Sequence, residues 1–407
     1  MSSNRTLRRA RCNVDAKRTD RVDAKGGTVK GRGMDRREFL RRAQLTGAAL
    51  ALPSVLVACA PEREEVQPSG GPEEGTLEGA TIKVGTYGGF FEENFSKMYP
   101  AFTKETGVEV ESVSEPTSEQ WVVQLEQATK AGAIPADVSM LSVVGMRRAE
   151  KGNVLANFST SDLPNNKYLA DGFVYENEQG DAIGVGAVSW YITLVSNTDR
   201  VKQSPDTWTA FWDPEWRNEL ALLKNPGNAF LLEVTAASFF DGYEILKTQD
   251  GVLEVLNKLA EVKPNVKLWF RDEGQAQQAY NTGEVSLGQF YHDITEFAAS
   301  QGEHLRSVFP KEGAILDSGF WAITRTTENL RACVAFIDYM CKPEVQAELA
   351  RTLGTSPTVQ QRFMDLTPKE YKSFSGPGPD AALRPDYRIY DEWEDWINDR
   401  WTEAIVS

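Results

Sequence analysis

Few residues in this sequence have the types and spacing that catalysis needs. His292 stands beside Asp293, and Asp272 is a second carboxylate that could share in acid/base chemistry. The only other histidine is His304, which excludes a zinc centre built from several histidines. No Ser/His/Asp ordering, metal-ligand spacing or phosphate-binding loop accompanies these groups, so we expect no metal or cofactor and keep an enzyme as the alternative hypothesis.

The stretch from Met34 to Cys59 has the parts of an export signal: a basic start, a short apolar middle and small residues before a cysteine. Its apolar run is about 16 residues, shorter than the ~20 that a membrane-spanning helix needs. Arg36-Arg37-Glu38-Phe39-Leu40 resembles a twin-arginine signal, and Leu56-Val57-Ala58-Cys59 resembles a lipoprotein box in which Cys59 carries the lipid. The alternative is a buried helix beside a chance arginine pair.

Charge separates the ends of the chain. Residues 1–33 hold ten Lys or Arg and three Asp with no apolar pattern, which indicates a basic extension or a start placed upstream of Met34. Without residues 1–58 the formal charge moves from −15 to −24 over the remaining 349 residues. A surface this acidic argues against nucleic acid as a partner and is compatible with cationic ligands.

Residues 59–79 are rich in Pro, Glu and Gly and predict a flexible tether. After it, strands and helices alternate: a strand over 81–87, helical spacing to Gly107, and further strands near 108–110 and 137–141. This alternation predicts an α/β lobe with a largely parallel sheet. Because ligands sit beyond the carboxyl ends of such strands, Thr86, Tyr87 and Ser142 are site candidates.

The second half of the chain predicts a second lobe. Strand-like patterns cover 182–197 and 285–291, and helical patterns cover 230–240, 251–262 and 330–340. Cys333 and Cys341 are too far apart along one helix for a disulfide and are expected to be small buried hydrophobes. An aromatic stripe near the C-terminus predicts helices docked on their own domain, although a carbohydrate platform is the alternative; its members are Tyr390, Trp393, Ile397 and Trp401.

Taken together, several segments resemble the extracellular solute-binding proteins of ABC importers, in the spermidine/putrescine-binding subgroup. The resemblance covers about residues 80–365 and rests on six segments in the family's order. These are Thr86-Tyr87-Gly88-Gly89, the run 102–110, the Trp-rich run 205–223, the run 282–288, Pro310-Lys311-Glu312-Gly313-Ala314, and Phe336-Ile337-Asp338-Tyr339-Met340.

The resemblance implies a two-lobed periplasmic-binding-protein fold of type II, with the ligand cleft between lobes joined by crossing strands. We expect lobe 1 to comprise 80–188 and 291–318, and lobe 2 to comprise 189–290 and 319–407 with the C-terminal docking helices. The crossings would fall near 185–195, 289–295 and 316–323, and we expect each lobe to have a sheet of its own. Ligand that touches both lobes would shift the population to the closed state.

A polyamine ligand needs carboxylates for its ammonium groups and aromatic faces for its methylenes. The acidic candidates are Asp272, Asp293 and Asp317, and the aromatic candidates are Tyr87, Trp190, Trp269 and Tyr291; the alternative for each is a core or solvated residue. Two departures from the polyamine pattern stand out. Lys224-Asn225-Pro226-Gly227-Asn228 replaces expected acids, and Val143-Val144 replaces a tyrosine, which favours a smaller or less charged amine.

The expected function is therefore a lipid-anchored, monomeric, periplasmic binding component that captures a small cationic, polyamine-like solute by hinge closure and delivers it to ABC permease subunits. A periplasmic enzyme is one alternative. A ligand-sensing subunit on the same two-lobed fold is the other.

Overall fold

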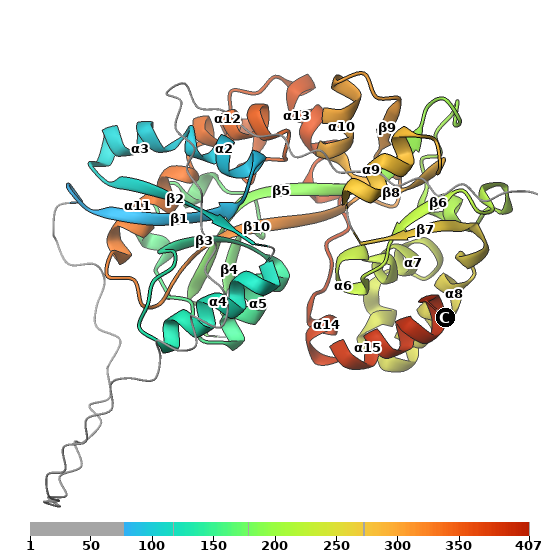
Figure 1. Ribbon diagram of the computed structural model, residues 1–407, viewed down its shortest axis with the longest axis horizontal. Helices are drawn as coiled ribbons and strands as arrows, with labels where there is room; N and C mark the ends of the chain where they lie inside the picture. Colours follow the sequence, from blue (N-terminus) through green and yellow to red (C-terminus); the bar gives the residue numbers. More distant parts are fainter. Residues whose placement is uncertain (1–76, 117, 178, 272, 407) are drawn as a thin grey trace, which may run out of the picture. The chain divides into compact units, whose positions relative to one another are not determined.

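The computed structural model describes residues 77–116, 118–177, 179–271 and 273–406. These residues belong to one compact unit, in which helices pack on a mixed sheet (Figure 1). The export signal predicted at 34–59, the basic extension and nearly all of the predicted tether lie outside the described residues. None of the helices in the described part of the chain is long and apolar enough to cross a membrane.

The N-terminal part follows the predicted alternation of strand and helix. Its parallel strands stand in the order β2, β1, β3, with bounds β1 (Thr81–Tyr87), β2 (Glu109–Glu115) and β3 (Val138–Ser142). The helices that connect and follow them are α2 (Phe90–Ser96), α3 (Tyr99–Thr106), α4 (Ser118–Lys130) and α5 (Val143–Lys151). Parallel neighbours need such helical crossovers, so the carboxyl ends of β1 and β3 meet at one edge of the sheet.

The middle of the chain repeats this plan. Here the parallel order is β7, β6, β8, with bounds β6 (Leu220–Leu223), β7 (Val266–Phe270) and β8 (Leu287–Tyr291). Its helices are α6 (Pro226–Ala229), α7 (Leu231–Phe239), α8 (Gln249–Ala260), α9 (Glu273–Asn281) and α10 (His292–Ser300). In α8 the Thr248 side chain accepts the Gly251 N–H and caps the first turn, and four aliphatic side chains at helical spacing are buried.

Two long antiparallel strands, β5 (Ala182–Asn197) and β10 (Ile315–Ile323), run through both parts (Figure 1). Two short strands, β4 (Val174–Glu176) and β9 (Leu305–Val308), pair with β5 near its two ends. On β5, the hydrophobic side chains that lead up to Tyr191 pack in one cluster, and those from Ile192 onward pack in another. On β10, Leu316 packs with Tyr191 in the first cluster and Ile315 packs with Ile192 in the second.

We call the elements that pack with Tyr191 the first lobe and those that pack with Ile192 the second lobe. The first lobe also includes a smaller cluster around Trp121 and Phe320. The expectation that each lobe has its own sheet is wrong, because β5 and β10 hydrogen-bond to the strands of both lobes and join ten strands into one sheet. The hydrophobic cores of the two lobes nevertheless remain separate clusters along that sheet.

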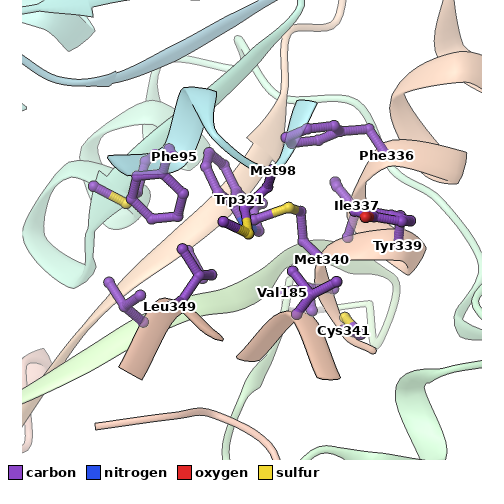
Figure 2. Close-up of a cluster of buried hydrophobic side chains, with 14 of the residues drawn as sticks. Phe95, Met98, Val185, Trp321, Phe336, Ile337, Tyr339, Met340, Cys341 and Leu349 are labelled. Carbon is purple, nitrogen blue, oxygen red and sulfur yellow. The ribbon is translucent and has the colours of Figure 1, made fainter. Parts of the chain in front are cut away.

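The clusters also divide the chain differently from the expected boundaries. Helices α11 (Leu330–Met340) and α12 (Pro343–Leu353) pack in the first lobe, not in lobe 2. Trp321 stands at the centre of this packing, with edge-on ring contacts to Phe95 in α2 and Phe336 in α11 (Figure 2). Cys333 and Cys341 are buried and free, as predicted. Conversely, the expected lobe 1 segment that begins at residue 291 contributes α10 and β9 to the second lobe.

The third crossing between lobes is not made at 289–295, because β8 and α10 both pack in the second lobe. It is made after α13 (Pro368–Ser375), where Ala382 packs in the first lobe and Leu383 in the second. Helices α14 (Arg388–Glu392) and α15 (Glu394–Trp401) then lie on the second lobe beside α6 and α8 (Figure 1). Ile397 and Trp401 are almost fully buried there.

Candidate functional site

A carboxylate and an indole face the boundary between the lobes. Asp317 on β10 is the backbone partner of Trp190 on β5. Its Oδ1 atom accepts the Ser318 N–H at 2.7 Å and the Tyr387 hydroxyl at 2.6 Å. Burial raises the pKa of Asp317 to about 6, although hydrogen bonds from Tyr387, Ser318 and Trp190 oppose the rise. The group is therefore an acid that a nearby cation can readily keep ionised.

A second carboxylate follows the end of β8. Asp293 lies in the first turn of α10, two residues after Tyr291. Its Oδ1 atom is buried and has no hydrogen-bond partner among the described residues. Burial raises the pKa of Asp293 to about 7, the N–H groups of Ile294 and Asp293 oppose the rise, and the charge of Glu273 adds to it. A buried acceptor without a donor is unfavourable, which makes this oxygen a candidate ligand contact.

These groups gather around the Tyr291 hydroxyl, whose pKa is raised by burial and then by the charges of Glu273, Asp317 and Asp293 and by Tyr87. We call this group the acidic compartment. Five of the sequence-predicted site residues belong to it or adjoin it: Tyr87, Trp190, Tyr291, Asp293 and Asp317. Glu273, in the first turn of α9, was missed, although its place directly after Asp272 was a signal. Asp272 itself lies outside the described residues.

The two predicted hydroxyl residues, Thr86 and Ser142, both lie at strand ends, as expected, but their hydroxyl groups differ in their contacts. Thr86, next to Tyr87 in β1, is fully buried, and its hydroxyl has no partner in the described part of the chain. Ser142 ends β3 and caps α5, because its Oγ accepts the Gly145 N–H at 3.2 Å. Ser142 also pairs with Gly319, two residues beyond Asp317 on β10. These contacts give Ser142 a structural task at the edge of the site.

Trp269 is not in the acidic compartment. It lies on β7 and makes an edge-on contact with Trp401 of α15, at a centroid distance of 6.4 Å. His292 is also occupied: its Nε2 lies 2.8 Å from the Ser373 carbonyl oxygen and its Nδ1 2.8 Å from Ser307 Oγ. A carbonyl can only accept, so Nε2 carries the proton, and burial lowers the pKa of the ring. A neutral, fully engaged imidazole is poorly suited to acid/base catalysis.

A cavity of about 620 Å³ opens between the lobes, and three cationic side chains line it. Lys224 follows the end of β6, Arg271 follows the end of β7, and Arg147 comes from α5 of the first lobe. The side chains of Lys224 and Arg271 make no hydrogen bond or ion pair within the described residues. We call this space the basic cavity. The replacement of acids by Lys224-Asn225 in the sequence was a signal for it, but Arg147 and Arg271 were missed.

Within the residues that the structure describes, no group of three or more His, Cys, Asp or Glu side chains is arranged to hold a metal ion. The site therefore offers carboxylates, aromatic rings and cations. These groups recognise charges on an organic solute.

Residues 97–373 match the family model described as bacterial extracellular solute-binding protein. The spermidine/putrescine-binding periplasmic protein of Salmonella typhimurium is 27% identical over 302 residues, which are 73% of this chain and 82% of that protein. The gamma-aminobutyric acid-binding protein of Pseudomonas aeruginosa is 28% identical over 193 residues, and this match spans only 46% of this chain and 53% of that protein.

The fold has solved counterparts. One is the spermidine/putrescine ABC transporter substrate-binding protein PotD from Streptococcus pneumoniae, with a TM-score of 0.66, 18% identity, and coverage of 80% of this chain and 98% of that one. At this identity the likeness concerns the two-lobed fold alone. Because the family model covers more than half of the 407 residues, the chain belongs to the bacterial extracellular solute-binding protein family.

Proposed function

We propose that this protein is the solute-binding component of an ABC importer, and that its solute is a small molecule with an ammonium group at one end and an anionic group at the other. One observation carries this proposal: an acidic compartment and a basic cavity adjoin the boundary between the same two lobes. A diamine would leave Lys224 and Arg271 unmatched. A dicarboxylate would meet the acids of the acidic compartment.

The proposed contacts of the ammonium group are Asp293, Asp317 and the face of Tyr291 or Trp190. An ammonium about 4 Å from a carboxylate gains about 4 kcal/mol at an effective dielectric of 20, before desolvation. An aromatic face adds about 0.5 to 2 kcal/mol. The anionic end would take Lys224 and Arg271, since a guanidinium can donate two parallel hydrogen bonds to a carboxylate.

The relatives support an amine as ligand. The names of those described above include spermidine, putrescine and gamma-aminobutyric acid. All three carry a primary amine, and the last also carries a carboxylate. The basic cavity favours the second kind of ligand, in agreement with the loss of acids after Leu223.

Hinge closure is the proposed means of capture. Tyr87 belongs to the first lobe, Tyr291 and Asp293 belong to the second, and Asp317 lies on a strand shared by both. A solute that contacts both lobes has more contacts when they close, so it shifts the population toward the closed state that a permease would accept. An enzyme remains less favoured, because His292 is neutral and engaged. A sensor subunit would use the same site and differ only in its partner.

The extracytoplasmic setting is proposed from the sequence. A twin-arginine-type signal at 34–59 would export the chain, lipid on Cys59 would anchor it, and residues 60–79 would hold the domain near a permease as a monomer. The relatives named above include a periplasmic protein, which supports this location.

Calorimetry with a matched four-carbon series tests the proposed ligand class. The series is 4-aminobutyrate, putrescine and succinate, titrated into the domain that begins at residue 60. We expect 4-aminobutyrate to bind at least about tenfold more tightly than the other two, equivalent to about 1.4 kcal/mol. Stronger binding of succinate would contradict the amine site, and stronger binding of putrescine would contradict the anionic end.

The double variant Lys224→Gln/Arg271→Gln separates the two ends of the ligand. It should weaken 4-aminobutyrate binding while leaving putrescine unchanged or slightly favoured. Lys267→Gln is the matched control, because Lys267 lies on β7 with its Nζ on the Glu284 carbonyl and does not line the cavity. Equal losses in the control and the double variant would show a general charge effect and no anionic subsite.

A further inference from the structure

The C-terminal segment, residues 376–406, lies beyond the part of the chain that matches the family model. It nevertheless forms much of one wall of the basic cavity. Its residues in that wall are Tyr387, Tyr390, Glu394, Ile397, Asn398, Trp401 and Thr402. Among the described residues, Glu394 is the only acidic side chain that lines this cavity. The segment is therefore part of the site and not only a support for the second lobe.

Backbone and side-chain contacts hold this wall in place. Leu383 donates to the Ala314 carbonyl at 2.8 Å, and its own carbonyl accepts the Leu316 N–H at 2.9 Å, so the segment runs along β10 at the lobe boundary. Farther on, the Tyr390 hydroxyl donates to Glu233 Oε2 at 2.8 Å inside the second lobe. A wall fixed at both points cannot move freely when a ligand enters.

Tyr387 occupies the point where the two halves of the site meet. Its hydroxyl donates to Asp317 in the acidic compartment at 2.6 Å. Its ring packs edge-on against Phe230, at a centroid distance of 5.6 Å, and lines the basic cavity. It also lines a second cavity of about 980 Å³ that shares Arg147 with the first. Tyr387 therefore contacts both the acidic compartment and the basic cavity.

We propose that Tyr387 is a specificity-determining residue, which sets the length of the accepted solute by separating its ammonium subsite from its anionic subsite. This inference rests on the proposed function. Tyr387 also positions Asp317: a carboxylate can accept about four hydrogen bonds, so the tyrosine hydroxyl and a ligand ammonium can donate to it together. The hydroxyl thus orients the carboxylate, and the ring limits the space beside it.

Two variants separate the ring from the hydroxyl. Tyr387→Phe keeps the ring and removes the donor to Asp317, while Tyr387→Ala removes both. Tyr371→Phe is the control, because Tyr371 lies on α13 in the first lobe and lines neither cavity. Each protein is titrated with ω-amino acids of three to six carbons and with diamines of the same lengths.

We expect the parent and Tyr371→Phe to prefer one chain length by about tenfold. Tyr387→Phe should keep that length preference, and Tyr387→Ala should reduce it to about threefold or move it to longer ligands. An unchanged length preference in Tyr387→Ala would overturn the proposal. If the parent protein bound none of these ω-amino acids or diamines, that result would instead count against the proposed function.

A measurement without ligand decides the second part of the inference. Carbon-13 NMR titration of the Asp317 carboxyl should give a higher pKa in Tyr387→Phe than in the parent, because the tyrosine hydrogen bond holds this pKa down. The same titration in Tyr371→Phe should match the parent. An unchanged Asp317 titration in Tyr387→Phe would exclude Tyr387 as its positioning residue, whatever ligand binds.

Discussion

Asp317 lies directly opposite Trp190 in the sheet, one residue from the point where both strands pass from one hydrophobic core to the other. The next pair, Leu316 with Tyr191, still packs in the first lobe, and the pair after it, Ile315 with Ile192, includes side chains of the second. Any change of angle between the lobes would therefore occur beside this carboxylate. A ligand bound to it is placed to stabilise one angle over another.

Asp317→Asn should weaken binding of any amine ligand by about tenfold or more, because it removes the charge that faces the ammonium. The asparagine can still accept the Tyr387 hydroxyl, so the fold should remain intact and the free domain should gain stability at neutral pH. Calorimetry and thermal unfolding measure the two effects. Asp199→Asn, which changes an exposed carboxylate near His304, is the control. Equal affinity of Asp317→Asn and the parent would remove Asp317 from the site.

Solute binding should depend on pH through the two buried carboxylates. Their pKa values are about 6 for Asp317 and about 7 for Asp293 in the free protein. An ammonium ligand favours the ionised forms, so binding should release protons near pH 6 to 7. Below about pH 6 the affinity should fall by up to tenfold per pH unit for each carboxylate. Calorimetry in buffers with different ionisation enthalpies counts the released protons, and a count of zero would contradict an ammonium contact.

The stability of the free domain should change with pH in the opposite sense. Asp293 has a raised pKa in the folded state, so between about pH 4 and 7 it holds a proton that the unfolded chain has lost. Stability from this group is present at low pH and is lost as pH rises through about 7. Glu273, Tyr291 and Tyr87 share its surroundings, so the comparison needs Asp293→Asn at each pH. Chemical unfolding should show a smaller loss between pH 5 and 8 for that variant than for the parent.

Sequence periodicity predicted the elements that position the site more reliably than their assignment to lobes. The strand predicted over 182–197 has those bounds, because a run of buried side chains on both faces is distinctive. For α11, helical spacing showed that one face is buried but not which core buries it. Its packing against α3 depends on contacts between residues more than 200 positions apart, such as Phe102 with Phe336.

For the site too, local patterns could be predicted from the sequence, whereas contacts between distant segments could not. Thr86, Tyr87 and Ser142 were identified because a parallel sheet brings strand ends together. The acidic candidates and the other aromatic candidates came from the chemistry that a polyamine ligand needs. Tyr387 was missed because nothing in the sequence of the C-terminal segment indicates that it returns to β10, 70 positions earlier. Trp269 was included as an aromatic face for the solute, yet it packs with Trp401, a pairing that the aromatic stripe alone did not reveal.

Trp269→Ala should therefore affect stability more than ligand binding. The indole is half-buried against Trp401, and truncation of such a ring costs about 2 kcal/mol or more. Urea unfolding measures the loss. Affinity for the solute should change less than threefold, or about 0.6 kcal/mol. Trp190→Phe provides the contrast, since it should weaken binding with a smaller effect on folding. A larger binding defect in the Trp269 variant would return this residue to the ligand site.

Closure of the lobes should be visible in solution and should require the boundary carboxylate. Small-angle scattering of the domain that begins at residue 60 should show a smaller radius of gyration with saturating solute than without it. Asp317→Asn at the same solute concentration should stay near the unliganded value, because the ligand then gains less from closing. Raising the solute tenfold or more should restore closure in the variant, as expected when a mutation weakens binding without blocking the hinge. Superimposable curves for the parent with and without a bound solute would refute hinge closure, since ligand that does not distinguish the open and closed states cannot shift their populations.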